Sequence, residues 1–447
     1  MSLVLQAIIV ALIGGILFSI IGVVPGTDET ATMAPITLIL VLMGFEPVVL
    51  FAWFIAIIVA MQITHTIPTA MAALPGSTMA VPMVENCNIG KMLGIPHITM
   101  RKMAAGSIVG SVIGLPVAVC FAQLLAPLSD IISQYSGLIF TIAACIIAYM
   151  SKSKWGAVVT LIPFAFLIQG LQRLSVEAVG GTLFTSIFMG ITIGPMICEL
   201  FNALVPANRE KNRKDGFKEI WLAPEAKDKL PLFPNPLKVV HKSTVKYVVP
   251  CAAVSACTFT FSPVGMTVML GELVGSKKKE LYDKITAAVG VQDAVSNATY
   301  LGELIIPMIA FGLPLSPVAL GPAAPLFNDI NLHDYLSMGD YILYGLIGII
   351  GGALFAYPIA MRKARSWSEM MFRHVSHEAL IGAFMGLIFM LAFHEAGVFG
   401  ILVTLIIGIF GGFLNNYFGI HTGVQFMAYY ASSWIVPTII GVCGTLI

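Results

Sequence analysis

The sequence has few charged residues and no bias toward either sign. Of its 447 residues only 11% are charged, and the formal net charge is +1, so no nucleic-acid partner is expected. It has no Gly-rich phosphate loop followed by Lys-Ser or Lys-Thr, so ATP-driven transport by this chain has no support. The seven cysteines are scattered and odd in number, which argues against a disulfide framework or metal-ligand spacing. We expect no cofactor and no metal site.

Apolar residues, in contrast, make up 58% of the chain, far more than in soluble globular proteins. Apolar runs long enough to cross a bilayer as helices recur from Leu3–Val24 to Val424–Leu446. Most runs are continuous, whereas barrel strands would alternate apolar and polar residues. The sequence therefore predicts an all-α polytopic membrane protein with about ten or eleven transmembrane helices, since each crossing needs about 20 residues.

The two ends of the first run bear on topology. No basic residue precedes Leu3–Val24, and Pro25-Gly26 follows it in place of a small-residue cleavage pattern, so we expect a retained span rather than a cleaved leader. Basic residues gather in other loops, including Lys277–Lys279 and Arg362–Arg373. The positive-inside rule places those loops in the cytoplasm and the N-terminus outside.

One segment interrupts the apolar pattern. Between Pro206 and Lys242 charged residues and prolines crowd together, and no membrane span fits there. We therefore expect two membrane halves, residues 1–202 and 243–447, joined by a charged cytoplasmic connector over residues 203–242.

The two halves contain related segments. "IPTAMAALPGSTMA" (Ile67–Ala80) and "IPMIAFGLPLSPVA" (Ile306–Ala319) share six of fourteen residues without gaps. Pro25 lies 50 residues before the Leu-Pro pair of the first segment, and Pro263 lies 51 residues before that of the second. The sequence thus predicts a duplicated unit, a broken helix followed by a re-entrant, proline-interrupted hairpin.

Paired interrupted segments of this kind indicate the binding site of a secondary transporter. The hairpins are expected near residues 64–90 and 293–327. Ser77 and Ser316 stand where helix N-caps belong, and each such start offers unpaired backbone N–H groups to an anion. The alternative, that each segment is a proline kink in an ordinary packed span, stays open. His65, beside the first hairpin, is interpreted as a structural histidine.

Acidic residues lie close to the same breaks. Carboxylates at membrane depth usually hold an ion, a proton or a partner, so Asp28, Glu29, Asp293 and Glu303, together with the amide of Asn297, are the candidates for a coupling-ion site. Oxygen ligands suit Na⁺, and the same carboxylates suit H⁺, so the ion stays open between the two. The alternative places Asp28 and Glu29 in a surface loop and Asp293 at a helix cap.

Several motifs together resemble a known family. They are "TATMA" (Thr30–Ala34), the "PGST" hairpin, "AGSIVGSVIG" (Ala105–Gly114) and "DAVSNATYLGELIIPMIAFGLPLSPVALGPAAPLF" (Asp293–Phe327). The chain resembles the large membrane subunit, of TctA type, of the tripartite tricarboxylate transporter family. The resemblance is well supported from about Gly14 to Phe327.

The resemblance implies ion-coupled uptake of organic carboxylates across a bacterial inner membrane. It also implies two partners, a small membrane subunit and a soluble periplasmic solute-binding protein. With the adjacent Thr27 and Thr78, it gives the predicted substrate-binding set: Pro25, Gly26, Thr27, Pro75, Gly76, Ser77, Thr78, Asn297, Gly312, Pro314 and Ser316.

The chain also departs from the family pattern. Thr27-Asp28-Glu29 replaces a leucine and small residues after the first Pro-Gly, Asp293 replaces a glutamate, and "SPVG" replaces the second Pro-Gly. We therefore predict a divergent member that carries a small di- or tricarboxylate with Na⁺ or H⁺ by alternating access. A homodimer is one assembly that such an architecture allows. The alternatives are a channel-like pore and a membrane-embedded enzyme, although the sequence shows no nucleophile–base pair.

Overall fold

The computed structural model describes residues 2–25, 27, 29–150, 153–206, 222, 230–259, 263–374, 377–420 and 422–446. Every regular element in these ranges is helical, which confirms the predicted helical class. Among the described residues, seven helices are long and apolar enough to cross a membrane, and four shorter apolar helices accompany them. The chain is a multi-pass helical membrane protein. The count of about ten or eleven spans stays a prediction.

The chain divides into two compact units, and each half of the sequence contributes to both. Unit 1 comprises Met1–Ser129 and Glu219–His377, and unit 2 comprises Asp130–Lys218 and Glu378–Ile447. The predicted halves follow chain order, whereas the units follow packing. Most of the predicted connector lies outside the described residues.

Unit 1 holds every predicted site residue that the structure describes. Its helices are α1 (Leu3–Ile21), α2 (Glu29–Leu42), α3 (Pro47–Thr64), α4 (Thr66–Ala72), η1 (Thr78–Met83), α5 (Val84–Met92), α6 (Pro96–Leu125), η2 (Ala126–Leu128), α12 (Pro236–Val240), α13 (Lys242–Ala256), α14 (Pro263–Gly275), α15 (Leu281–Ala310), α16 (Pro317–Leu320), α17 (Ala324–Asn328), η3 (Leu332–Asp334), α18 (Met338–Pro358), η4 (Ile359–Lys363) and α19 (Ala364–His374). Unit 2 is formed by α7 (Ser129–Gln134), α8 (Ser136–Met150), α9 (Trp155–Val179), α10 (Phe184–Leu204), α20 (His377–Phe418) and α21 (Thr422–Leu446).

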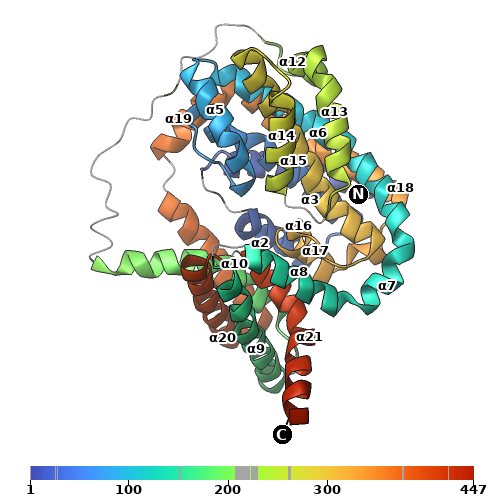
Figure 1. The fold of residues 1–447 in the computed structure, drawn as a ribbon, viewed down its shortest axis with the longest axis vertical. Helices are drawn as coiled ribbons and strands as arrows, with labels where there is room; N and C mark the ends of the chain where they lie inside the picture. The colour runs from blue at the N-terminus through green and yellow to red at the C-terminus, as the bar shows by residue number, and fades with distance from the viewer. Residues whose placement is uncertain are drawn as a thin grey trace. The chain divides into compact units, whose positions relative to one another are not determined.

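Two helices, α3 and α15, form the buried centre of unit 1 (Figure 1). Every residue from Val49 to Thr64 in α3 and from Ile285 to Ala310 in α15 is buried. Helix α3 packs on α1 and α18, and α15 packs on α6, α13 and α14. A helix enclosed on all sides must satisfy its polar side chains within the protein.

Helices α1, α3 and α6 of the first half correspond in order to α13, α15 and α18 of the second half. Corresponding pairs of helices make corresponding contacts. Helix α1 packs on α3 as α13 packs on α15, and α1 packs on α18 as α13 packs on α6. Helix α3 packs on α18 as α15 packs on α6. Each half therefore packs its central helix against a long helix of the other half, which supports the predicted duplication.

Small residues allow the close contact between α6 and α15. The close approaches are Gly106 to Gly290, Gly110 to Ala294, and Gly114 to Ala298. A Cβ at Gly110 would overlap the Ala294 carbonyl oxygen. Such spacing of small residues by four is how membrane helices bring their backbones together.

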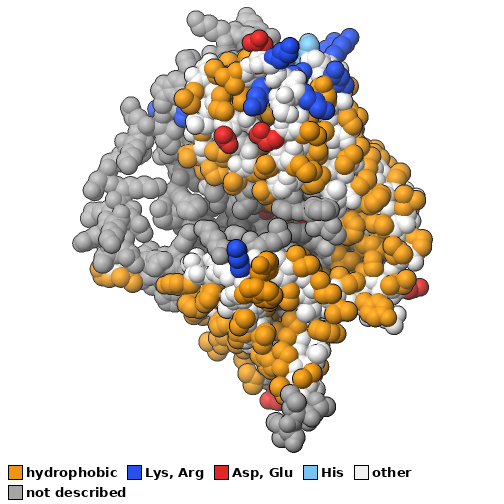
Figure 2. Space-filling model, in the orientation of Figure 1, with side chains coloured by type: hydrophobic (Ala, Val, Ile, Leu, Met, Phe, Trp, Pro, Cys, Tyr) orange, Lys and Arg blue, Asp and Glu red, His pale blue; other side chains and the backbone are white. Residues whose placement is uncertain are grey.

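The outward faces of the helices are apolar. Ile13 in α1, Ile350 in α18 and Leu402 in α20 are exposed, and hydrophobic side chains cover much of the visible surface (Figure 2). Exposed apolar faces of this extent suit contact with lipid rather than water.

Within unit 2, helix α20 is interrupted at Ala396 and Gly397, which have non-helical dihedral angles. Glu395, just before the interruption, accepts bonds from the backbone N–H groups of Thr185 at 2.8 Å and Ser186 at 2.6 Å. These residues begin α10. Glu395 therefore supplies the acceptors and the negative charge that a helix N-terminus favours.

Candidate functional site

The two backbone breaks of the first half meet in unit 1. The chain leaves α1 through Pro25 and Thr27, and it leaves α4 through Pro75 and Gly76. The Thr27 N–H donates to the Gly76 carbonyl oxygen at 3.0 Å. A Cβ at Gly76 would overlap the His65 carbonyl oxygen, so only glycine permits this approach.

Ser77 connects the side chains of Glu29 and His65. Its Oγ lies 2.6 Å from Glu29 Oε1 and 2.6 Å from His65 Nδ1, and it accepts a bond from the Met79 N–H at 3.2 Å. Glu29, Ser77 and His65 are all buried. A hydroxyl has one proton to donate. When Glu29 is ionised, Ser77 donates this proton to it, and His65 then carries a proton on Nδ1 and donates to Ser77. His65 Nε2 then has no hydrogen-bond partner among the described residues.

The second half has a related arrangement around Ser316 and Glu303. Ser316 Oγ donates to the main-chain carbonyl of Glu303 and accepts from the Ala319 N–H at 3.1 Å. The Val318 N–H donates to Glu303 Oε2 at 3.4 Å, while Glu303 Oε1 is buried without a partner in the described part of the chain. In both halves, a buried glutamate thus contacts the chain just after a Leu-Pro turn.

The backbone has a similar positive φ at the residue where each of the two turns begins. Ala73, at the end of α4, has φ of 59°, and Gly312, just after α15, has φ of 62°. These residues occupy the same position when Ile67–Ala80 is aligned with Ile306–Ala319. Left-handed backbone costs a non-glycine residue about 1 kcal/mol. The equivalent turns therefore persist even where one half lacks the favoured glycine, although a re-entrant path through the membrane stays a prediction.

Helix α15 carries two predicted polar residues one turn apart, in different surroundings. Asn297 Nδ2 donates to Ser107 Oγ at 2.6 Å, and Asn297 Oδ1 accepts from Ser111 Oγ at 3.2 Å. The Asn297 amide is therefore held by α6. Asp293 is fully buried, and neither of its carboxylate oxygens has a hydrogen-bond partner among the described residues. An ionised Asp293 would carry an unpaired charge in the interior, which a cation or a proton would remove.

The structure therefore brings together two groups of predicted residues. Thr27, Glu29, Gly76 and Ser77 form the first, and Glu303 with Ser316 forms the second. The others occupy the following places: Pro25 and Pro75 are half-buried in the first-half turns, Asp293 and Asn297 lie on α15, and Gly312 and Pro314 lie in the turn after it. Gly26 and Asp28 lie outside the described residues, as does the side chain of Thr78. The binding roles of all these residues stay predictions.

Two features of the site were missing from the predicted set. His65 is predicted to be structural, and no motif in the sequence indicates its contact with Ser77 across the intervening turn. Ser107 and Ser111, which hold Asn297, do have a signal. Their four-residue spacing in "AGSIVGSVIG" places both hydroxyls on one helix face.

Ser77, His65 and Glu29 are also the residue types of a hydrolase triad, but they are joined in another order. In a triad the histidine takes the serine proton and the acid holds the histidine. Here Ser77 donates to Glu29, and His65 Nδ1 lies 3.9 Å from Glu29 Oε1, too far for a hydrogen bond. Among the described residues, His65 is therefore not placed to take the Ser77 proton, and the order of bonds differs from that of a triad.

The chain matches a protein-family model over most of its length. Residues 8–422, nearly the whole chain, match the family model described as "Tripartite tricarboxylate transporter TctA family". No curated protein and no solved structure matches the chain.

Proposed function

Because the chain belongs to the tripartite tricarboxylate transporter TctA family, we propose that it is the membrane subunit that carries a small organic di- or tricarboxylate by secondary active transport. The family is one of transporter components and not of enzymes. We further propose Na⁺ or H⁺ as the coupling ion and the bacterial inner membrane as the location.

The observation that supports this proposal most is the placement of Glu29 and Glu303. Each is buried, and each contacts the chain directly after the Leu-Pro turn of its half. The helices that begin there are short, six residues in η1 and four in α16, so their dipoles are weak. Glu29 also begins the longer helix α2, and the Lys91 ammonium donates to the Ala72 carbonyl beside the first turn, so the carboxylates act together with these groups.

These carboxylates suggest how the ion and the substrate are coupled. A substrate carboxylate roughly 5 Å from an ionised glutamate would be repelled by about 3 kcal/mol at an effective dielectric constant of about 20. This repulsion weakens binding by about a hundredfold. A Na⁺ or H⁺ at Glu29 or Glu303 removes it, so the ion and the substrate bind more tightly together than apart.

The remaining parts of the proposal follow from the family. A small membrane subunit and a periplasmic solute-binding protein would deliver the substrate, and alternating access would move it past the two turns. A homodimer of the scaffold is compatible with this scheme. The second candidate is a channel-like pore, which would conduct downhill without ion coupling.

Uptake into proteoliposomes tests the proposal. The purified chain, with its partner subunits added where uptake requires them, is supplied with labelled citrate or succinate under a Na⁺ gradient, a pH gradient or neither. We expect saturable uptake that one of the two gradients drives above equilibrium. Glu29→Gln and Glu303→Gln should each abolish the gradient dependence, because a neutral side chain no longer binds the ion.

Glu85→Gln serves as the matched control, since Glu85 is exposed at the start of α5. It should leave uptake unchanged. Unsaturable downhill flux in the wild type would favour a pore. Unchanged ion dependence in both glutamate variants would remove these residues from the coupling site.

A further inference from the structure

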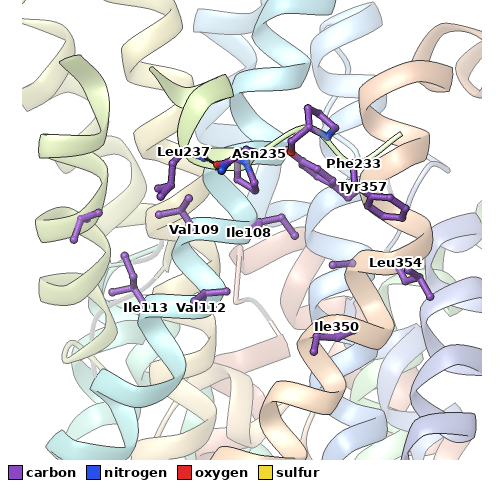
Figure 3. Close-up of a pocket in the computed structure, with 14 residues that line it drawn as sticks. Ile108, Val109, Val112, Ile113, Phe233, Asn235, Leu237, Ile350, Leu354 and Tyr357 are labelled. Atoms are coloured by element: carbon purple, nitrogen blue, oxygen red, sulfur yellow. Dashed lines mark hydrogen bonds between the residues drawn. The ribbon is translucent and has the colours of Figure 1, made fainter. Parts of the chain in front are cut away.

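A cleft unrelated to the glutamates lies elsewhere in unit 1. It has a volume of about 730 Å³ and is formed by α6, α13, α18 and residues 233–237. Figure 3 shows Phe233, Asn235 and Leu237 at one end of the cleft and Val112 and Ile350 toward the other. Apart from Asn235 and Tyr357, the lining side chains are hydrocarbon. Small-molecule sites have volumes of this order, about 300–1,000 Å³.

Residues 233–240, at the Asn235 end of the cleft, are held by hydrogen bonds from α18 and from α6. The Tyr357 hydroxyl of α18 donates to the Pro234 carbonyl at 2.9 Å. The Lys102 ammonium of α6 donates to the carbonyls of Val239 at 2.6 Å and Val240 at 3.1 Å. The cleft is therefore a built feature and not a gap beside a loose loop.

All the walls carry basic residues at this same end. Arg101 Nε of α6 donates to the Met361 carbonyl at 3.3 Å, which joins the start of α6 to η4, the helix that follows α18. The basic residues are Arg101 and Lys102 before α6 enters the cleft, Lys238 in α12, Lys242 and Lys246 in α13, and Arg362 and Lys363 after Tyr357. No acidic residue occurs in segments 96–102, 235–246 or 357–364. Lys and Arg side chains gather at the α12 end of unit 1 in Figure 2.

We propose that the cleft binds an anionic phospholipid. An acyl chain lies between α6 and α18, and the phosphate is bound by Arg362 and Lys363, both of which are exposed. Arg101 and Lys102 already donate to backbone carbonyls, so they shape the site. Hydrocarbon walls favour a lipid chain over a soluble anion. Basic pockets between membrane helices recognise anionic headgroups on the cytoplasmic side, where the positive-inside rule places this end.

Native mass spectrometry of the purified chain, with added dioleoyl phosphatidylglycerol or dioleoyl phosphatidylcholine, tests the proposal. The wild type should bind one phosphatidylglycerol in clear preference to phosphatidylcholine. Arg362→Gln with Lys363→Gln should weaken phosphatidylglycerol binding by about 25-fold, roughly fivefold for each charge, and leave phosphatidylcholine unchanged. Ala353→Phe, which fills the cleft, should weaken binding of both lipids.

The matched control is Lys154→Gln with Arg173→Gln in unit 2, which removes the same two charge types and should change neither affinity. Melting curves identify folded variants, and Arg362→Gln alone or Ala353→Leu replaces any that fails to fold. Equal binding of the two lipids by the wild type would overturn the proposal, as would a preference that survives loss of both charges. Displacement by glycerol 3-phosphate at the same concentration would indicate a soluble-anion site and would also overturn it.

Discussion

Replacing Ser77 by alanine removes three hydrogen bonds from a buried site. The hydroxyl bonds Glu29, His65 and the Met79 N–H. Loss of the N-cap costs about 1 kcal/mol. Leaving the buried His65 N–H unsatisfied costs about 1–3 kcal/mol, and Glu29 loses a bond of about 1.5–3 kcal/mol. Because neighbouring groups relax, we expect the lower end of the sum, a fall of about 3–4 kcal/mol in the free energy of unfolding.

Denaturant unfolding of the purified protein in mixed micelles measures this change. A double-mutant cycle with Glu29→Gln isolates the Ser77–Glu29 contact, for which we expect an interaction energy of about 1–2 kcal/mol. The control is Ser433→Ala, whose exposed hydroxyl donates to the Tyr430 carbonyl. It should change stability by less than about 0.5 kcal/mol. A Ser77→Ala effect as small as that of the control, with no interaction energy in the cycle, would refute the assigned hydrogen bonds.

Two further changes use the same unfolding assay. Gly110→Ala should cost about 1–3 kcal/mol, because the added methyl group forces α6 away from the Ala294 carbonyl. Gly170→Ala, in α9 with nothing within 4 Å, should be neutral or slightly stabilising, and equal effects of the two changes would contradict the close α6–α15 contact. Glu395→Ala should cost about 2 kcal/mol, because it removes the acceptors at the start of α10, and unchanged stability would mean that the capping contributes nothing.

The apolar helices were predictable from the sequence, but the buried helix α15 was not. Helix α15 contains Asp293, Asn297 and Glu303. These polar residues interrupt the apolar pattern by which the other helices are predicted. A different signal was present, since Gly290, Ala294, Ala298 and Gly302 recur every four residues. That spacing indicates a helix whose backbone is closely approached by others. In α15 the spacing of small residues, and not an apolar run, is therefore the signal of close packing against other helices.

The candidate site was predictable in part. The repeated Leu-Pro segments led to Ser77 and Ser316, and the acidic residues near the breaks led to Glu29 and Glu303. The resemblance to the TctA family, based on these motifs, is confirmed by the match over residues 8–422. The contact of His65 with Ser77 was not predictable, because it depends on how tightly the turn folds back over Gly76.

The packing of each half's central helix against a helix of the other half has a consequence for biosynthesis. Helix α6 ends at Leu125, and its partner α15 begins 156 residues later, at Leu281. At about 5–20 residues per second, ribosomes need about 8–30 s to make that stretch. Throughout this interval the glycine face of α6 lacks α15, and the hydroxyls of Ser107 and Ser111 lack the Asn297 amide. The core of unit 1 therefore cannot form in the order in which the chain is translated. It forms only after α15, in the second half, has entered the membrane.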